Sequence, residues 1–381
     1  MSYKRLGDYI QQVNVRNRDL EVETLLGVSN TKKMIPSIAN TVGTDMSTYK
    51  IIKKRQFAYG TITSRNGDRL SIAISDQYDK ALVSQIYIVF EVIDDDELLP
   101  EYLMMWFSRP EFDRYARFHS HGSTREAFDW EDMCEVELPI LSIEEQREIV
   151  AQFQSIANKI KVNEQICEKL EATAQALYKH WFVDFEFPNE NGQPYKSSGG
   201  NMVWNEELGK EIPEGWKVRS LDKLYKFQYG LGNNNPDNGG EYPVYGSNGI
   251  IGYYDKFNSE ESPVIGHIGA NCGSMVFGYG KHYVTYNGVI CKINNEKYKY
   301  YGYRTLQFLD LMSETRGSSQ PFISYDILHS LKYFEFSDTL LHIFNVNDSK
   351  LFKKHKILLQ QNQKLTQLQS LLLSRLATLE N

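Results

Sequence analysis

Cysteine is scarce in this chain, and the few present are scattered. Cys134, Cys167, Cys272 and Cys291 form no C-x-x-C pair. Zinc sites use closely spaced cysteines, and disulfide frameworks belong to oxidising compartments. We therefore expect reduced thiols and no zinc site, as in a cytoplasmic protein. The chain also lacks an apolar run long enough to span a membrane, and its first residues do not resemble a signal peptide, so we expect no membrane association.

Recognisable catalytic motifs are missing as well. The sequence has no D-P-P-Y or N-P-P-Y quartet of an amino-methyltransferase and no G-x-x-x-x-G-K-[ST] loop for a nucleotide. Asp237 and Glu241 lack the lysine of a nuclease site, and His119 and His121 lack obvious further metal ligands. We therefore predict that the chain is not an enzyme and holds no catalytic residue, metal or cofactor of its own.

An excess of positive charge is also lacking. The 42 Lys and Arg residues are outnumbered by 49 Asp and Glu residues, for a net charge of −7. Because phosphate binding needs concentrated cations, this balance taken alone argues against a nucleic-acid partner. A local basic face remains compatible with it.

Glycine and proline are absent from residues 143–182, which predicts one long helix. Apolar residues recur there in alternating steps of four and three, the pattern of a helix that buries a narrow stripe against another helix. The stripe consists of Ile149, Phe153, Ile156, Ile160, Cys167, Leu170, Ala174, Leu177 and Trp181, with Asn163 in the one polar position. Ser142 and Glu145 form an S-x-x-E capping box at the start of this helix.

A second stretch without glycine or proline, residues 347–379, predicts a partner helix. Its stripe consists of Leu351, His355, Leu358, Asn362, Leu365, Gln369, Leu372, Leu376 and Leu379. If the two helices pair antiparallel, Asn163 and Asn362 lie near each other, and a buried Asn pair fixes the register of such a coil. The alternative is that both Asn side chains lie at solvated edges of the stripe.

The long helices divide the chain into four segments. We predict a strand-rich globule at 1–140, the first helix at 141–185, a linker and second globule at 186–346, and the second helix at 347–381. The linker is inferred from its Gly, Pro, Ser and Asn content, and the second globule from short β-type runs separated by glycine.

The two globules resemble each other in sequence. Leu6-Gly7-Asp8 near the start of the first parallels Leu221-Asp222-Lys223 in the second. The further parallels are Gly122-Ser123-Thr124 with Gly317-Ser318-Ser319, Phe128 with Phe322, and Asp132 with Asp326. This plan of globule, helix, globule and helix predicts an internal repeat with pseudo-two-fold symmetry.

Four motifs stand out along the chain: P-I-L-S-I-E-E-Q at 139–146, A-Q-A-L-Y-K-H-W-F-V-D-F at 174–185, I-P-E-G-W at 212–216 and Y-P-V-Y-G-S-N-G-I-I-G at 242–252. In this order they resemble the specificity subunit of type I restriction–modification systems, and the resemblance covers essentially the whole chain. The second helix departs from the pattern, because Asn347-Asp348-Ser349 stands where an E-E-Q entry is expected. The resemblance implies an α+β chain in which two α/β target recognition domains are separated by two long antiparallel helices that form a coiled coil.

The resemblance also implies a function. Each globule reads one half of a split, asymmetric site in double-stranded DNA, and the helices set the gap and dock two modification subunits. Restriction subunits then join the complex. S-adenosylmethionine, ATP and Mg²⁺ are expected in those partner subunits, and the location is the cytoplasm of a bacterium or archaeon.

Candidate base-reading residues lie in polar loops, because Arg can pair with guanine and Asn with adenine. In the first globule they are Ser64, Arg65, Asn66, Arg69, Ser123, Thr124 and Arg125. In the second they are Tyr245, Ser247, Asn248, His267, Asn271, Arg316, Ser318 and Gln320. The alternatives are an ordinary charged hairpin near Asn66 and a helix-capping role for the loop at Ser123. A coiled-coil adaptor without DNA specificity is the alternative for the whole chain.

Overall fold

The computed structural model describes residues 3–37, 43–63, 69–122, 126–232, 236–317 and 319–376. These residues form two compact units. Unit 1 comprises Met1–Val162 and Asn362–Asn381, and unit 2 comprises Asn163–Gln361. The division falls within both long helices, so each unit contains a globule and one part of each helix.

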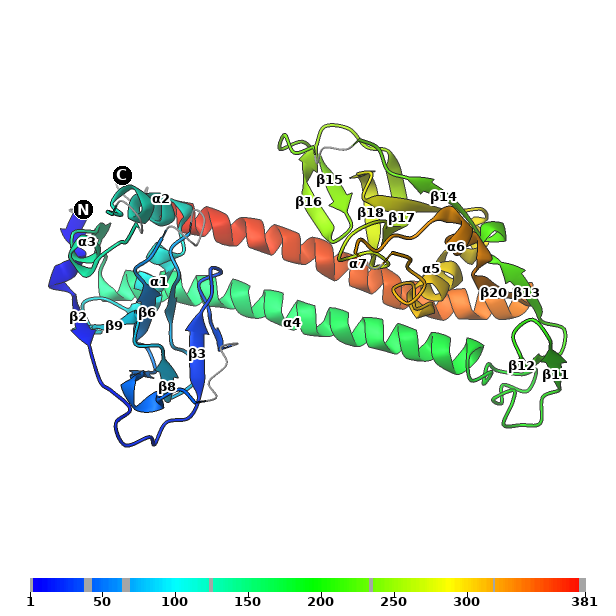
Figure 1. Ribbon diagram of the computed structural model, residues 1–381, viewed down its shortest axis with the longest axis horizontal. Coiled ribbons are helices and arrows are strands. Elements are labelled where there is room, and N and C mark those ends of the chain that lie inside the picture. Colours follow the sequence, from blue (N-terminus) through cyan, green and yellow to red (C-terminus); the bar gives the residue numbers. More distant parts are fainter. Residues whose placement is uncertain are drawn as a thin grey trace. The chain divides into compact units, whose positions relative to one another are not determined.

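The two long helices are α4, Ile143–Phe182, and α7, Asp338–Arg375 (Figure 1). Every predicted stripe position of α4 is buried or half-buried, as are those of α7 up to Leu376, whereas Leu379 lies outside the described residues. The predicted start of the second helix at Asn347 is wrong, because α7 begins at Asp338. Its first turns bury Leu340, Leu341 and Phe344 in the core of the second globule rather than along the coiled-coil stripe.

Antiparallel pairing of the helices is confirmed within each unit. In unit 2, Asn163 is fully buried and its Nδ2 donates to Oε1 of Gln361 at 3.0 Å. In unit 1, Nδ2 of Asn362 donates to the carbonyl oxygen of Ile160 at 3.3 Å. Each Asn therefore bonds to the opposite helix. Because Asn163 and Asn362 belong to different units, their approach to each other stays a prediction.

The predicted capping box at the start of α4 is confirmed. The Ser142 Oγ accepts the N–H of Glu145 at 3.4 Å, and the Glu145 carboxylate accepts the N–H of Ser142 at 3.0 Å. One turn later, the fully buried Gln146 accepts the N–H of Leu99 at 2.8 Å and donates to the carbonyl of Glu97 at 2.9 Å. Gln146 thereby ties the entry of α1 to the long helix.

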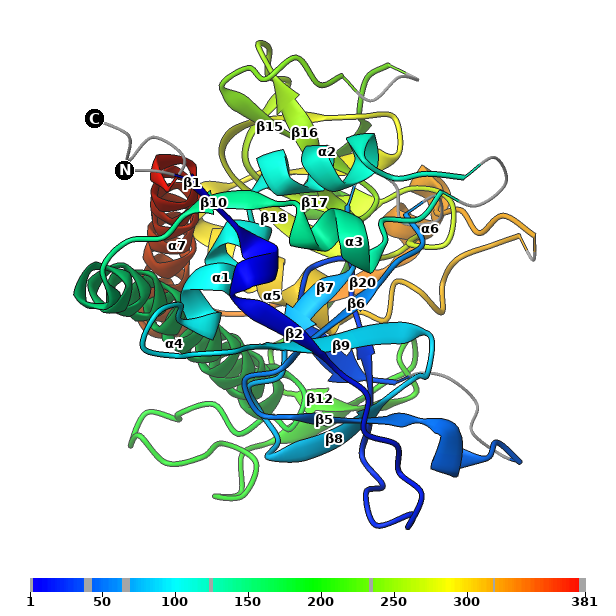
Figure 2. The same ribbon diagram turned by 90° about the vertical axis from the view of Figure 1, so that its left-hand side faces the viewer.

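The first globule contains two four-stranded sheets, with orders β2-β9-β6-β7 and β4-β3-β8-β5. Helix α1 packs on the first of these sheets (Figure 2). There Phe107 of this helix meets Phe57 and Phe90 edge-on, with ring centroids 5.8 and 6.2 Å apart. The strands are β1 Tyr3–Arg5, β2 Ile10–Val13, β3 Leu25–Val28, β4 Met34–Pro36, β5 Lys50–Lys53, β6 Phe57–Gly60, β7 Ile72–Ile74, β8 Lys80–Val83, β9 Tyr87–Val92 and β10 Glu137–Pro139, and the helices are α1 Pro100–Phe107, α2 Pro110–Phe118 and α3 Trp130–Cys134.

The second globule has one six-stranded sheet in the order β14-β19-β17-β18-β15-β16. Two further strand pairs flank it, β11 with β12 and β13 with β20. The strands are β11 Met202–Asn205, β12 Lys210–Pro213, β13 Lys217–Ser220, β14 Tyr225–Tyr229, β15 Tyr242–Gly246, β16 Gly249–Tyr254, β17 Ser259–Gly266, β18 Met275–Val284, β19 Gly288–Ile293 and β20 Lys332–Glu335, and the helices are α5 Lys299–Phe308 and α6 Tyr325–Ser330.

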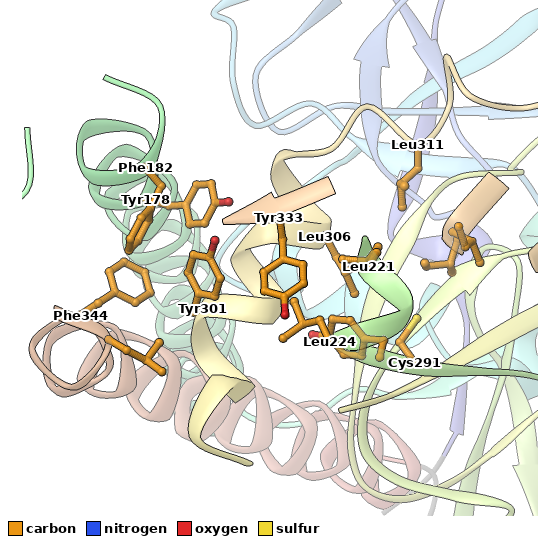
Figure 3. Close-up of a cluster of buried hydrophobic side chains, with 14 of the residues drawn as sticks. Tyr178, Phe182, Leu221, Leu224, Cys291, Tyr301, Leu306, Leu311, Tyr333 and Phe344 are labelled. Carbon is orange, nitrogen blue, oxygen red and sulfur yellow. The ribbon is translucent and has the colours of Figure 1, made fainter. Parts of the chain in front are cut away.

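An aromatic core joins this second globule to its part of the helix pair. Figure 3 shows Tyr178 and Phe182 of α4, Tyr301 of α5 and Phe344 of α7 turned toward one another. Phe182 lies 4.8 Å from Tyr301 and 4.9 Å from Phe344 between ring centroids. The predicted linker after α4 is packed too, since Phe187 stacks on Trp216 at 5.0 Å.

The predicted repeat is confirmed by the register of the strands. Strand β6 lies between β9 and β7 in the first globule, and β17 lies between β19 and β18 in the second. Tyr59 pairs with Ile72 and Ile88, and Ile265 pairs with Met275 and Val289 at the equivalent positions. The globules differ in the length of these strands. Strands β17 and β18 are long enough to stay paired within one six-stranded sheet, whereas the first globule has two separate four-stranded sheets.

Loop contacts refine the predicted parallels by one residue. His121 and Ala127 exchange backbone hydrogen bonds, and so do Arg316 and Phe322. Ala127 is therefore the equivalent of Phe322, and the buried Phe128 is the equivalent of the buried Ile323. The predicted pairings of Phe128 with Phe322 and of Asp132 with Asp326 are each displaced by one position, because sequence similarity favoured the aromatic and acidic residues.

Candidate nucleic-acid interface

Three loops meet at one end of the first globule. The N–H of Phe128 donates to the carbonyl of Thr61 at 2.8 Å, which joins the loop after β6 to the loop before α3. The Ser71 Oγ bonds to Oδ1 of Asn30 at 2.7 Å, which joins the entry of β7 to the β3–β4 turn. We call residues 29–33, 61–63, 69–71, 119–122 and 126–127 the first loop edge.

A positively charged hollow of about 790 Å³ opens beside the first loop edge. Its lining comprises Asn30, Thr31, Lys32, Arg69, Ser108, Pro110, Asp113, Arg114 and Arg117. The single acid among them, Asp113, accepts a 2.6 Å hydrogen bond from the Lys32 ammonium and a 3.0 Å bond from the N–H of Leu70. Since Lys32 and Asp113 neutralise each other, the positive charge of the hollow comes from Arg69, Arg114 and Arg117, of which Arg114 is paired with Glu111 at 3.1 Å.

Burial governs the chemistry of Lys32. Its ammonium lies against Asp113 in a site with little solvent access, and burial lowers its pKa although the Asp113 carboxylate opposes that shift. The backbone of Lys32 has a φ of 61°, a left-handed conformation that turns the β3–β4 connection toward α2. Lys32 is therefore a fixed part of the wall, whereas Arg69 and Arg114 present exposed guanidinium groups.

Of the residues predicted to read bases in the first globule, the structure describes only Arg69. It lies in the lining of the hollow. Ser64, Arg65 and Asn66, together with Ser123, Thr124 and Arg125, lie outside the described residues, so their roles stay predictions.

Equivalent loops meet at one end of the second globule. The N–H of Ile323 donates to the carbonyl of His267 at 3.0 Å, and the N–H of Gly269 donates to the carbonyl of Pro321 at 2.9 Å. The Ser274 Oγ donates to the carbonyl of Ser247 at 2.5 Å, which joins the β15–β16 turn to the entry of β18. We call residues 246–249, 266–274, 285–288, 316–317 and 319–323 the second loop edge.

Gly266 is required where these loops converge. A Cβ atom at this position would lie 2.3 Å from the carbonyl oxygen of Asn271 and 3.1 Å from that of Ser247. No side chain fits there without displacing both loops. The close approach of the 247 and 271 loops is thus built on a glycine.

Aromatic rings line the second loop edge. The His267 ring lies 4.3 Å from Tyr229 and 5.5 Å from Tyr286 between centroids, and its Nδ1 donates to the carbonyl of Ile323 at 2.9 Å. Tyr229 in turn stacks on Tyr325 at 4.1 Å. Tyr286 and Phe322 are exposed. This edge therefore offers the exposed rings of Tyr286 and Phe322 together with the exposed Arg316, whereas His267 is buried. The first edge offers the guanidinium groups of the hollow.

Most residues predicted to read bases in the second globule lie along this edge. They are Ser247, Asn248, His267, Asn271, Arg316 and Gln320. Tyr245 differs, because its side chain lies in a core cluster with Val264 and Val284, and burial raises its pKa to about 12. A side chain in that core is not positioned to touch a base. The same holds for His267, which is also 7% exposed and is bonded to the carbonyl of Ile323. Ser318 lies outside the described residues.

Sequence reasoning missed the β3–β4 turn and the arginines of α2. The turn contributes Asn30, Thr31 and Lys32, and α2 contributes Arg114 and Arg117. A signal was present, since Gly27-Val28-Ser29-Asn30 repeats the Gly246-Ser247-Asn248 pattern of the second globule with one insertion. Nothing in the sequence places α2 beside that turn.

Membrane-spanning helices and metal-binding clusters are both absent from the described ranges. No helix among them is long and apolar enough to cross a membrane. No group of three or more His, Cys, Asp or Glu side chains among them is arranged to hold a metal ion.

Known proteins match the chain in both halves. The family described as "Type I restriction modification DNA specificity domain" matches residues 29–172 and 213–332. The specificity subunit of the type I restriction enzyme MjaIX of Methanocaldococcus jannaschii is 34% identical over 139 residues, which cover 36% of this chain and 30% of that protein. The HindI specificity subunit of Haemophilus influenzae is 30% identical over 161 residues, which cover 42% and 34%. The chain thus spans about a third of the length of these curated relatives.

A solved structure shares the fold over nearly the full chain. The crystal structure of a type I restriction–modification S subunit from M. genitalium matches 98% of this chain and 95% of that one, with a TM-score of 0.58 at 16% identity. The two family matches together cover more than half of the sequence, one in each half. The predicted resemblance is therefore confirmed, and the protein belongs to the family of type I restriction–modification DNA specificity domains.

Proposed function

We propose that this chain is the sequence-reading subunit of a type I restriction–modification complex. In this proposal each loop edge reads one half of a split, asymmetric site in double-stranded DNA. The observation that supports it most directly is the repetition of one loop arrangement, in the same register, in both globules of a DNA specificity domain family member.

The first loop edge has the chemistry that DNA contact needs. Guanidinium groups pair bidentately with guanine and bind phosphate, and the arginines of the hollow concentrate positive charge on a chain of net charge −7. Two acids near these arginines are already paired, Asp113 with Lys32 at 2.6 Å and Glu111 with Arg114 at 3.1 Å. Arg69 and Arg114 are the side chains that we expect to touch DNA there.

The second loop edge suits contact through rings and hydrogen bonds. Asn248 and Gln320 are exposed at its turns, and Tyr286 presents an exposed ring. Amide side chains pair with adenine in the major groove, and apolar ring edges contact the thymine methyl group. The two edges are thus expected to prefer different half-sites, which makes the whole site asymmetric.

In this proposal the helices set the gap between half-sites and dock two modification subunits, with restriction subunits joining later. A helix of 40 residues is roughly 60 Å long, which exceeds one turn of B-DNA at roughly 34 Å. S-adenosylmethionine, ATP and Mg²⁺ belong to those partner subunits, and this chain carries no catalytic step. The cytoplasm of a bacterium or archaeon is the expected location.

The net charge of −7 leads to a further part of the proposal. The modification subunits supply much of the phosphate contact, and this chain supplies mainly base readout. The isolated chain is then expected to bind DNA weakly. Tight, salt-sensitive binding by the isolated chain would contradict this part.

Selection from randomised DNA, with and without the modification subunit, tests the function directly. A split motif with one fixed gap, enriched only with that subunit present, is the expected result. Failure to enrich any motif in either condition would contradict DNA reading and favour a coiled-coil adaptor.

The hollow has a test of its own in the assembled complex. Arg69→Ala is expected to weaken DNA binding and to lower the slope of log K against log salt by about 1, as for loss of one phosphate contact, or to relax the sequence preference at one position if the contact is to a base. Lys54→Ala is the matched control, because Lys54 is exposed and precedes the end of β6 that lies away from the first loop edge. Equal effects of both substitutions would remove the hollow from the interface.

A further inference from the structure

A buried ionic cluster joins the second globule to both long helices within unit 2. Arg304 of α5 donates from Nε to both carboxylate oxygens of Asp348 on α7, at 3.0 and 3.3 Å. Its Nη1 donates to both carboxylate oxygens of Glu171 on α4, at 2.8 Å each. The Arg304 side chain is 2% exposed and that of Asp348 is 0% exposed. One guanidinium group therefore contacts the globule's helix and both members of the pair.

The geometry of this cluster is directional. A guanidinium group is planar and rigid, and two carboxylates bound on different sides of it fix its plane. Gln307 on the next turn of α5 completes the arrangement, since its Nε2 donates to Glu171 at 2.6 Å and its Oε1 accepts from Arg304 at 2.7 Å. Rotation or sliding of α5 over the helix pair would break several of these bonds at once.

Further polar contacts between the second globule and α7 lie beside this ionic cluster. The Tyr279 hydroxyl lies 3.1 Å from Nδ1 of His355, and Glu261 of β17 pairs with Lys356. Around them, Phe352 packs against Phe277 at 4.8 Å between ring centroids. The strands of the second globule and its helix α5 are thus held to α7 by directional bonds set in an apolar surround.

The first globule has apolar residues at the equivalent positions. Tyr102 and Tyr301 are equivalent, because their hydroxyls donate to the carbonyls of Pro139 on β10 and Phe334 on β20, at 3.1 and 2.9 Å. Three residues further along α1 and α5 stand Met105 and Arg304. Phe153 and Asp348 each lie eleven residues beyond the helix caps Ser142 and Ser337, and Met105 and Phe153 belong to one apolar cluster.

Stability alone does not account for the ionic form of this contact. Buried ion pairs lose so much hydration that apolar residues of similar volume often replace them without loss of stability, and the first globule shows that this fold accepts such residues. What the ionic form adds is direction, because apolar contact is non-directional.

We propose that the Arg304–Asp348–Glu171 cluster fixes a single orientation of the second globule on the helix pair, and thereby the single gap at which the chain accepts its two half-sites. The orientation stands on the structure alone, whereas the gap rests on the proposed function. Arg304 is a positioning residue in this scheme and is not expected to touch DNA.

Distance measurement within unit 2 tests the orientation without DNA. Spin labels at Asn248→Cys on the second globule and Thr173→Cys on α4, both exposed sites, report the distance between globule and helix in the full chain. We expect one narrow distance distribution in the parent chain and a broadened or second population in Arg304→Met/Asp348→Phe, which installs the pair found in the first globule. An unchanged narrow distribution in that folded variant would overturn the proposal.

Two further variants complete this experiment. Arg219→Met/Glu335→Gln removes an exposed 2.8 Å ion pair between β13 and β20, and is expected to leave the distribution unchanged. Glu171→Gln removes only the half-exposed carboxylate and covers the case in which the double variant does not fold. A broadening of this distribution supports the proposal, and an unchanged distribution in Glu171→Gln with an unfolded double variant counts against it.

Selection from randomised DNA with the assembled complex tests the gap. The double variant is expected to enrich the same half-site sequences as the parent, but at more than one gap length. A single unchanged gap would contradict the link from orientation to spacing. Absence of any split motif with the parent chain would instead contradict the proposed function, and would leave the distance result standing.

Discussion

The two globules share a backbone but differ in the side chains that hold it. Arg55 lies two residues before β6, and Glu261 lies at the register shift within β17. The two residues hold the same position relative to the paired core strands, and both have a positive φ, 69° and 43°. Arg55 bonds to Glu101 near the start of α1 at 2.9 Å, whereas Glu261 pairs with Lys299 at the start of α5 at 3.6 Å. The sign of each charge is reversed while the contact between strand and helix is kept. The backbone bend is thus the shared requirement, and either charge satisfies it if the partner is opposite.

The same difference recurs where each globule meets the helices. The first globule uses Met105 and Phe153 in an apolar cluster, and the second uses Arg304 and Asp348 in an ion pair. At the loop edges the first has three arginines around a hollow, whereas the second combines the exposed Arg316 with the exposed rings of Tyr286 and Phe322. The two globules therefore share the pairing of their strands. Where their side-chain contacts differ, both partners of a contact differ together.

The largest expected effect comes from removing only one partner of the buried Arg304–Asp348 ion pair. Arg304→Met leaves Asp348 buried without its cation, which is expected to lower the free energy of unfolding by about 3–5 kcal/mol in urea unfolding of the full chain. Arg304→Met/Asp348→Phe is expected to recover most of that loss. A loss below about 1 kcal/mol in Arg304→Met would show that water reaches Asp348 or that its surroundings rearrange easily.

The next effect concerns the entry of each long helix. Gln146 stands where α7 has Leu341, four residues after the cap serine in both cases. Gln146→Leu copies the second globule into the first, but leaves the N–H of Leu99 and the carbonyl of Glu97 unpaired. We expect a loss of about 2–3 kcal/mol in urea unfolding. A neutral result would mean that the α1 entry finds other partners.

The Arg304–Asp348 ion pair also predicts a pH dependence of stability that the apolar residues Met105 and Phe153 of the first globule lack. Burial raises the pKa of Asp348 to about 6, although Arg304 opposes the shift. Because the folded pKa lies above the unfolded value near 4, the folded state binds the proton more tightly, and stability falls as pH rises from about 4 to about 6. Relative to Asp348→Asn, the parent chain is expected to lose on the order of 2 kcal/mol over that window and nothing above it. A flat difference between the two chains from pH 4 to 7 contradicts this pKa.

The smallest effect compares the two caps. The Ser142 Oγ accepts the N–H of Glu145 at 3.4 Å and has a reciprocal bond from Glu145, whereas the Ser337 Oγ accepts the N–H of Leu340 at 3.3 Å without a glutamate at that position. Ser142→Ala is expected to cost about 1 kcal/mol and Ser337→Ala about half of that. Amide hydrogen exchange in the first turns of α4 and α7 measures both. A larger loss for Ser337→Ala than for Ser142→Ala would show that the reciprocal bond from Glu145 does not stabilise the start of α4.

Much of this architecture could be predicted from sequence, because heptad stripes and capping boxes are local patterns. The start of α7 was not, since Leu340, Leu341 and Phe344 face a globular core and follow no heptad spacing. The stretch at Asn347-Asp348-Ser349, interpreted as an unusual helix entry, lies inside α7. Its polar residue Asp348 is explained by the buried ion pair with Arg304.

The candidate site was only partly predictable for a related reason. The loops at Ser247, His267 and Arg316 were found because glycines and polar residues mark turns, and the structure brings them together. Tyr245 carries the same marks but alternates inward along β15. The hollow near Lys32 joins segments almost 90 residues apart, and no local pattern reports such a meeting.

The antiparallel pairing has a consequence for the order in which the protein is made. Leu376, in the last described turn of the chain, is buried in the same apolar cluster as Val150. At a synthesis rate of about 5–20 residues per second, the ribosome needs roughly 10–45 s to pass from one to the other. During that time the first globule lacks the part of α7 that carries Leu376, and the apolar surface that Leu376 covers in the folded protein stays exposed. The N-terminal globule is therefore synthesised well before its core can be complete.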